Sequence, residues 1–181
     1  TGDAIFVGTS TGSLFGQNQG SADVWFARCD ATGAVLWQKQ FGTSGWDAAY
    51  GVSVSPTGDV FVGGVTTGSL AGPHANADDA WVAKFDLNGV EAWRRQLGST
   101  PYETATATAP DAGGGVFVVG HSGNPSTTWS YDAWVSRYDR HGNQQWIFSL
   151  GTNAEDRALT AIADGLGGLL VSGLTGADLF G

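Results

Sequence analysis

The sequence predicts an all-β protein built from tandem four-stranded antiparallel sheets. Glycine accounts for 29 of the 181 residues, and eight Trp, nine Phe and four Tyr accompany a charged fraction of only 14%. This composition is typical of short strands joined by tight turns, because glycine adopts turn conformations readily and aromatic side chains build a core. A pattern of about 55 residues recurs along the chain, and no segment has the apolar periodicity of a helix.

Several anchor residues of the repeat keep one register. Trp37 recurs as Trp93 and Trp146, 56 and 53 residues further along. Asp-Val-Trp at 23–25 recurs as Asp-Ala-Trp at 79–81 and again at 132–134. Two further sets share the spacing: Gly42, Gly98 and Gly151, and Asp47, Glu103 and Asp156. Anchor residues that keep the same spacing over three copies indicate a structural repeat.

The second copy shows its elements most clearly. Ala48–Val54 alternates small and apolar residues, which predicts a first strand, and Ser55–Gly58 has turn composition. Val60–Thr66 is apolar almost throughout, as expected of a second strand buried on both faces. A longer loop, Thr67–Asp78, follows it.

The second half of each copy reads as a hairpin. Ala80–Phe85 predicts a third strand, and Val90–Leu97 predicts a fourth. Between them, Asp can cap the turn with its side chain while Gly supplies a positive φ. The equivalent turns are Asp30–Gly33, Asp86–Gly89 and Asp139–Gly142.

Four antiparallel strands in every repeat of this length are the signature of β-propeller blades. With the strands lettered A to D from the inside outward, the chain is interpreted as a single propeller segment, 1–181, that begins at strand B. Closed propellers need at least about four blades, so we expect an open arc or part of a larger ring. The lack of methionine also predicts a processed product or a piece of a longer chain. The expected divisions are 1–42 (strands B, C and D of a first blade), 43–98 (second blade), 99–151 (third blade) and 152–181 (strands A and B of a fourth).

Part of the first copy points to a particular family. Gly-Ser-Leu-Phe-Gly at 12–16, Asp-Val-Trp-Phe-Ala-Arg-Cys-Asp at 23–30 and Leu-Trp-Gln-Lys-Gln-Phe-Gly at 36–42 resemble the bacterial SBBP-type β-propeller repeat. The resemblance covers essentially the whole chain, and the shortened third copy around 120–132 departs from it. It implies a secreted or bacterial cell-surface protein with a large propeller domain, and it brings no catalytic residues.

Charge and composition exclude several partners. Eight basic and 17 acidic residues give a net charge of −9, so nucleic acid is not an expected partner. Membrane insertion is not expected either, because no apolar run approaches the ~20 residues that a spanning helix needs. Cys29 is the only cysteine, so no disulfide can form within the chain.

Residues that recur in register are interpreted as structural. Six of the eight tryptophans are periodic and are expected to pack the blades. The acidic sets of Asp30 and Asp47 are expected to cap turns and loops. The periodic cations Arg28, Lys84 and Arg137 are expected to pair with an acidic set between blades.

Chemistry that needs a metal, a cofactor or a nucleophile finds little support. The Asp-x-Asp-x-Asp-Gly spacing of a calcium loop is missing, and the cluster at His74 to Asp79 is interpreted as a solvated loop. No nucleophile motif is present, so we predict no catalytic residue, no metal site and no cofactor.

Residues that break the repeat are the candidate binding residues. They gather on the face that carries the loops 11–22, 67–78 and 122–131. We therefore predict a non-enzymatic extracellular module that serves as a scaffold or binds proteins, with further blades supplied in cis or in trans. Two alternatives stay open: a carbohydrate-binding module, and part of a propeller enzyme whose catalytic residues lie outside this segment. The candidate contact residues are Trp46, Tyr50, His74, Asn76, Asp78, Trp129, Tyr131 and Arg157.

Overall fold

A computed structural model describes residues 2–75, 77–99, 102–123 and 130–178, which form thirteen β-strands and no helix. Accordingly, no described segment is a helix long and apolar enough to cross a membrane. The strands fall into antiparallel sheets of three, four, four and two strands that follow one another along the chain. Their bounds are β1 Ala4–Ser10, β2 Asp23–Cys29, β3 Val35–Phe41, β4 Asp47–Val54, β5 Val60–Thr66, β6 Asp79–Phe85, β7 Glu91–Leu97, β8 Tyr102–Pro110, β9 Val116–Gly123, β10 Tyr131–Tyr138, β11 Gln144–Leu150, β12 Asp156–Ala163 and β13 Leu169–Thr175.

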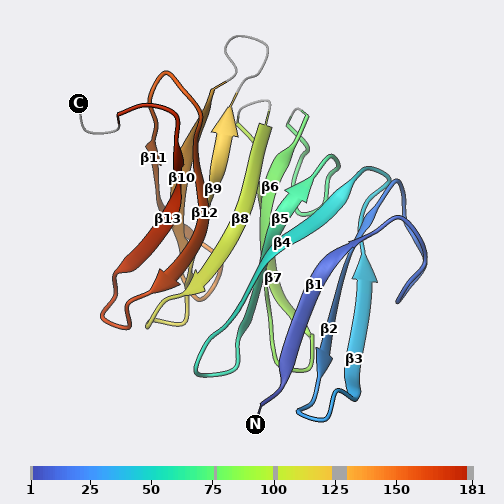
Figure 1. Cartoon of the computed structure of the whole chain (residues 1–181). Coiled ribbons are helices and arrows are strands. Elements are labelled where there is room, and N and C mark those ends of the chain that lie inside the picture. The colour runs from blue at the N-terminus through green and yellow to red at the C-terminus, as the bar shows by residue number, and fades with distance from the viewer. Residues whose placement is uncertain (1, 76, 100–101, 124–129, 179–181) are drawn as a thin grey trace.

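Each sheet is a meander in which neighbours in sequence are neighbours in space. The first sheet has the order β1-β2-β3, the second β4-β5-β6-β7, the third β8-β9-β10-β11 and the fourth β12-β13. The prediction of an all-β fold with four-stranded antiparallel sheets is thus confirmed. Figure 1 shows the sheets side by side from the blue N-terminal end to the red C-terminal end, without closure into a ring.

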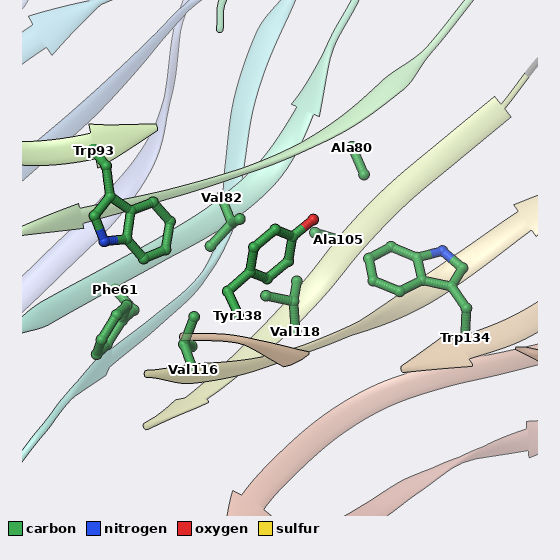
Figure 2. Close-up of a cluster of buried hydrophobic side chains, with 9 residues drawn as sticks. All are labelled: Phe61, Ala80, Val82, Trp93, Ala105, Val116, Val118, Trp134 and Tyr138. Atoms are coloured by element: carbon green, nitrogen blue, oxygen red, sulfur yellow. The ribbon is translucent and has the colours of Figure 1, made fainter. Parts of the chain in front are cut away.

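The first strand of each new sheet packs against the sheet before it. β4 contacts β1 and β2, β8 contacts β4, β5 and β6, and β12 contacts β8, β9 and β10. Two apolar clusters fill the junctions between sheets. One joins the first and second sheets around Phe26, Val62 and Trp81. The other joins the second and third sheets, where Tyr138 lies between Trp93 and Trp134 (Figure 2).

The predicted Asp–Gly turns are confirmed. Asp86 Oδ1 accepts hydrogen bonds from the backbone N–H groups of Asn88 and Val90, both at 2.8 Å, and Gly89 has a φ of 74°. These hydrogen bonds lower the pKa of the Asp86 carboxyl, because they favour its charged form. Asp30 and Asp139 cap their turns in the same way.

A bulge recurs in the first strand of the second, third and fourth sheets. The register of β4 shifts between Ala49 and Gly51, and equivalent shifts occur in β8 and β12. In β4 the bulge lies beside Gly64 of β5, where any Cβ atom would overlap the carbonyl oxygen of Ala48. Because Gly64 has no side chain, the Trp81 indole N–H can reach the Ala48 oxygen at 3.1 Å.

The periodic cations pair differently from the prediction. Arg28 pairs with Asp3, Lys84 with Asp59 at 2.9 Å, and Arg137 with Asp111 at 2.8 Å. The expectation of pairing between blades was wrong, because each carboxylate lies beside the first strand pair of the cation's own sheet. Cross-sheet contact comes instead from hydrogen bonds to backbone carbonyls, Arg28 to Leu87 at 2.7 Å and Lys84 to Gly114 at 3.2 Å.

Candidate functional site

The predicted contact residues do not all lie in loops. Trp46 directly precedes β4, and Tyr50 is the extra residue of the β4 bulge. Tyr131 begins β10 and Arg157 is the second residue of β12, so both belong to strands. His74 and Asp78 lie in the loop before β6. Asn76 and Trp129 are outside the described residues.

One group of these residues surrounds Asp78. Burial and the nearby charge of Asp79 raise the pKa of the Asp78 carboxyl, and His74 counteracts this. Burial and the Asp78 charge likewise raise the pKa of the Tyr50 hydroxyl. Tyr50 exposes 54% of its surface, and Trp46, whose backbone N–H donates to the Thr67 hydroxyl, exposes 42%. An exposed tyrosine beside a carboxylate suits contact with a protein or a sugar.

A second group lies where the third and fourth sheets meet. The guanidinium of Arg157 stands 4.5 Å from the centre of the Tyr131 ring and pairs with Glu155 at 2.7 Å. The His121 ring meets Tyr131 edge to face, with centroids 5.3 Å apart. Sequence reasoning considered His121 only as a zinc ligand and missed this contact. The available signal was that His121 replaces Val65 of the previous repeat in an otherwise apolar strand.

His121 predicts a pH dependence of stability. Burial and the charge of Arg157 lower the pKa of its imidazole to about 4, whereas an unfolded histidine titrates near about 6.5. The unfolded chain therefore binds the extra proton first, so this contribution to stability is complete above about pH 6.5 and is lost as the pH falls toward 4. We expect the wild type to lose about 2 kcal/mol relative to His121→Gln over this interval. Urea unfolding at pH 7.0, 5.5 and 4.5 measures the difference. Parallel pH profiles for the two proteins would contradict the prediction.

The recurrent acidic residues serve the architecture. Asp79 Oδ2 accepts a hydrogen bond from the Gln96 amide at 2.7 Å, and the same amide donates to the Gly68 carbonyl at 3.0 Å. Asp23 and Gln40 repeat this arrangement and anchor the long loop of the first sheet. The other set caps the connections between sheets by accepting hydroxyl hydrogen bonds, and its pairs are Asp47 with Thr43, Glu103 with Ser99 and Asp156 with Thr152. Within the described part of the chain, no three His, Cys, Asp or Glu side chains gather to hold a metal ion.

The opposite rim carries a contact that recurs between sheets. The Trp37 indole donates to the carbonyl of Leu87 at 2.7 Å, in the β6–β7 turn of the next sheet. The Trp93 indole donates in the same way to Arg140 at 3.0 Å, in the β10–β11 turn. Trp146 has the equivalent position in the third sheet, yet it remains 42% exposed, whereas Trp93 exposes 8%. The outward face of β11 is therefore uncovered where the earlier sheets are covered.

A cavity of about 690 Å³ lies between β7 of the second sheet and β10 and β11 of the third. Trp134 and Tyr138 line it, and each is 2% exposed. Burial raises the pKa of the Tyr138 hydroxyl to about 12, so this group stays protonated at neutral pH. None of the predicted contact residues lines the cavity.

Comparison with known proteins finds a related sequence and a similar structure. No family model matches the chain. The chain is similar to the regulatory protein FlaEY of Caulobacter vibrioides, with 33% identity over 125 residues, or 60% of this chain and 13% of that protein. The chain thus spans only a small part of that relative. It is also similar in structure to a protein of unknown function from Bacteroides caccae, with a TM-score of 0.51 and 11% identity, over 91% of this chain and 49% of the other. This likeness concerns the fold alone.

Proposed function

We propose that the chain is an arc of a β-propeller of the SBBP-repeat type that acts, without catalysis, as an extracellular scaffold for protein–protein interaction. The observation that carries the proposal is the uncovered outward face of β11. Trp146, Phe148 and Leu150 expose 42%, 60% and 38% of their surface there. A run of this kind on one strand face is a site of association.

The repeat itself indicates what covers this face. At both earlier junctions, the indole of the last strand meets the turn between the third and fourth strands of the next sheet. The fourth sheet has only β12 and β13 in the described chain, and Ile162 and Leu170 expose 65% and 64% of their surface. Two further strands with an Asp-x-x-Gly turn would cover both β11 and the fourth sheet. The proposed occupant is therefore more of the same repeat, in cis or in trans.

The long-loop rim is the proposed contact surface for a protein partner. Tyr50 is exposed there beside Asp78, and Trp46 is exposed next to Thr67, whereas the opposite rim consists of short capped turns. The relative FlaEY is called a regulatory protein, which is compatible with a module that acts by binding.

Native mass by light scattering, measured beside denatured mass, tests the proposal. We expect either a denatured mass well above 18.7 kDa, for blades in cis, or a native mass that is a multiple of 18.7 kDa, for blades in trans. In the second case, Phe148→Asp should lower the native mass toward that of one chain, because a carboxylate on the uncovered face would be buried unpaired. Leu166→Asp is the matched control, since Leu166 is 94% exposed in the turn between β12 and β13. A monomer of 18.7 kDa would contradict the proposal.

A further inference from the structure

β1 has a free edge at a position where the other sheets carry a further strand. β1 corresponds to β5, because Gly8 pairs with Trp25 as Gly64 pairs with Trp81. By the same register it corresponds to β9 and β13. Each of these three strands pairs with the first strand of its sheet, whereas β1 pairs with β2 alone among the described residues. The other edge of β1 therefore has unused backbone hydrogen-bonding groups.

The glycine at this position lets the bulge of a first strand approach closely. At Gly64, Gly120 and Gly173, an added Cβ atom would overlap a carbonyl oxygen of the first strand. The residues that carry these oxygens are Ala48, Thr104 and Arg157. β1 keeps the glycine as Gly8, where an added Cβ would first meet the Trp25 ring, at 2.7 Å. Gly8 thus leaves room for the tryptophan and, on the free edge, for a bulge carbonyl.

The indole beside this glycine can bind a first strand. In the second sheet, the Trp81 N–H donates to the carbonyl of Val65 in β5 and to that of Ala48 in β4. The Trp25 N–H donates to Thr9, the counterpart of Val65, at 3.3 Å. No described residue takes the place of Ala48 beside Trp25. The third sheet keeps the glycine without this indole hydrogen bond, so the glycine is the more constant feature.

A hydroxyl at the end of β1 matches the acidic residue that begins each first strand. In the second sheet, the Thr66 hydroxyl at the end of β5 donates to Asp47, the first residue of β4. In the fourth sheet, a hydrogen bond from Thr175 lowers the pKa of the Asp156 carboxyl. Ser10 has the equivalent position in β1, and its hydroxyl bonds to the loop that follows. The donor for an incoming carboxylate is therefore present.

β1 also has none of the features that usually protect a free edge. Its sequence, Ala-Ile-Phe-Val-Gly-Thr-Ser, contains no charge and no proline. It pairs with β2 along its whole length without a bulge. An edge of this kind is a template for the addition of a β-strand.

The first strands of the other sheets show what kind of segment fits. Each begins with an acidic residue, has alanine two positions later and a small residue two positions after that. The three segments are Asp-Ala-Ala-Tyr-Gly at 47–51, Glu-Thr-Ala-Thr-Ala at 103–107 and Asp-Arg-Ala-Leu-Thr at 156–160. The alanine lies opposite the glycine of the second strand in every case, and it is almost fully buried.

We infer that the free edge of β1 is a binding site for one bulged strand of this type, which pairs antiparallel with β1 and places its alanine opposite Gly8. The inference rests on the proposed function, because it names the element with which more of the same repeat would join the first sheet. It concerns a different surface from the outward face of β11. β12 of a second copy does not fit, since β13 already occupies its pairing edge. The occupant is a first strand that has no second strand of its own.

A synthetic peptide with the sequence 43–57, which contains β4, tests the inference. Labelled at its N-terminus and titrated with the full chain, it should bind with a Kd below about 100 µM by fluorescence anisotropy. Amide hydrogen exchange in the segment 4–10 should slow about tenfold or more when the peptide is bound. A peptide with Ala49→Lys should bind about tenfold more weakly or worse, because this side chain is buried opposite the glycine.

Two variants of the chain locate the site. Gly8→Ala should weaken binding of the unchanged peptide about tenfold or more, because its Cβ would stand where the bulge carbonyl must lie. Gly12→Ala is the matched control and should leave the affinity unchanged, since no atom lies within 4 Å of an added Cβ there. Circular dichroism and thermal unfolding check that both variants are folded. The Ala49→Lys peptide leaves the chain unchanged, so it tests the inference whether or not Gly8→Ala folds.

Three results would overturn the inference. The first is that the peptide does not bind. The second is binding that neither Ala49→Lys in the peptide nor a folded Gly8→Ala chain weakens. The third is slower exchange that spares 4–10, which would show that the peptide binds elsewhere, for example by replacing β4 in the second sheet. The proposed function is judged by native mass without the peptide, so the two failures can be told apart.

Discussion

Trp81→Ala is expected to lower the free energy of unfolding by about 3–5 kcal/mol. Trp81 is fully buried between the first and second sheets, and its ring meets Phe41 edge to face at 5.9 Å. Its indole N–H donates to the carbonyl oxygens of Ala48 and Val65, both at 3.1 Å. The substitution would therefore leave a cavity and also remove a hydrogen bond from two buried carbonyl groups.

Urea unfolding followed by far-ultraviolet circular dichroism measures this loss. Trp146→Ala is the matched control, because it has the periodic position on the last strand but is 42% exposed in the isolated chain. We expect the control to cost less, about 2 kcal/mol, because Trp146 keeps close to half of its surface exposed. Trp81→Phe separates the cost of the cavity from the cost of the lost hydrogen bonds, since it keeps most of the apolar volume and removes only the indole donor. Equal losses for Trp81→Ala and Trp146→Ala would contradict the described packing.

Gly64→Ala is expected to destabilise the chain by about 3 kcal/mol or more, although it adds a single methyl group. A Cβ atom at Gly64 would overlap the Ala48 carbonyl oxygen and approach the Ala49 Cα within 2.9 Å. Both are backbone atoms of the β4 bulge, so no side-chain rotation relieves the contact. The bulge would have to move, and with it the acceptor of the Trp81 indole.

Two other glycines serve as controls for this prediction. At Gly72 the nearest atom to an added Cβ is the Gln96 Cβ at 3.7 Å, an ordinary contact, and at Gly12 no atom lies within 4 Å. Alanine at either position should change the unfolding free energy by less than about 0.5 kcal/mol. Gly120 has the equivalent position in the third sheet, where a Cβ would overlap the Thr104 carbonyl oxygen. If Gly64→Ala changed the unfolding free energy no more than Gly72→Ala, the β4 bulge would be shown to shift at little cost in stability.

The local elements could be predicted because their causes are local. The Asp86–Gly89 turn depends on a side-chain oxygen two to four residues from the N–H groups that it binds, and on one glycine with positive φ. Val60–Thr66 was predicted as a strand buried on both faces, and every residue of β5 is buried. The bulges were missed, because an extra residue in an alternating strand leaves little trace in the pattern.

The residues of the candidate sites were predicted less well. Trp46 and Tyr50 are exposed at the predicted rim, but the contact of His121 with Tyr131 and Arg157 joins three strands of two sheets. Periodicity identifies which positions correspond, not which side chains meet across a junction. The same limitation explains the error over Arg28, whose carboxylate partner Asp3 directly precedes the first strand of the same sheet.

By itself, the sequence determined the all-β fold, the four-stranded repeat and its capped turns, because each depends on residues within a few positions of one another or on a repeated register. Only the tertiary structure decided how much space each junction between sheets leaves. Leu97 and Ile147 are ordinary apolar residues when read along the chain. They line a cavity of about 690 Å³ where two sheets meet, whereas Phe41 and Arg94 line a space of about 420 Å³ at the earlier junction. Volume at a junction is a sum over both of its faces, and the chain brings those faces together only when it folds.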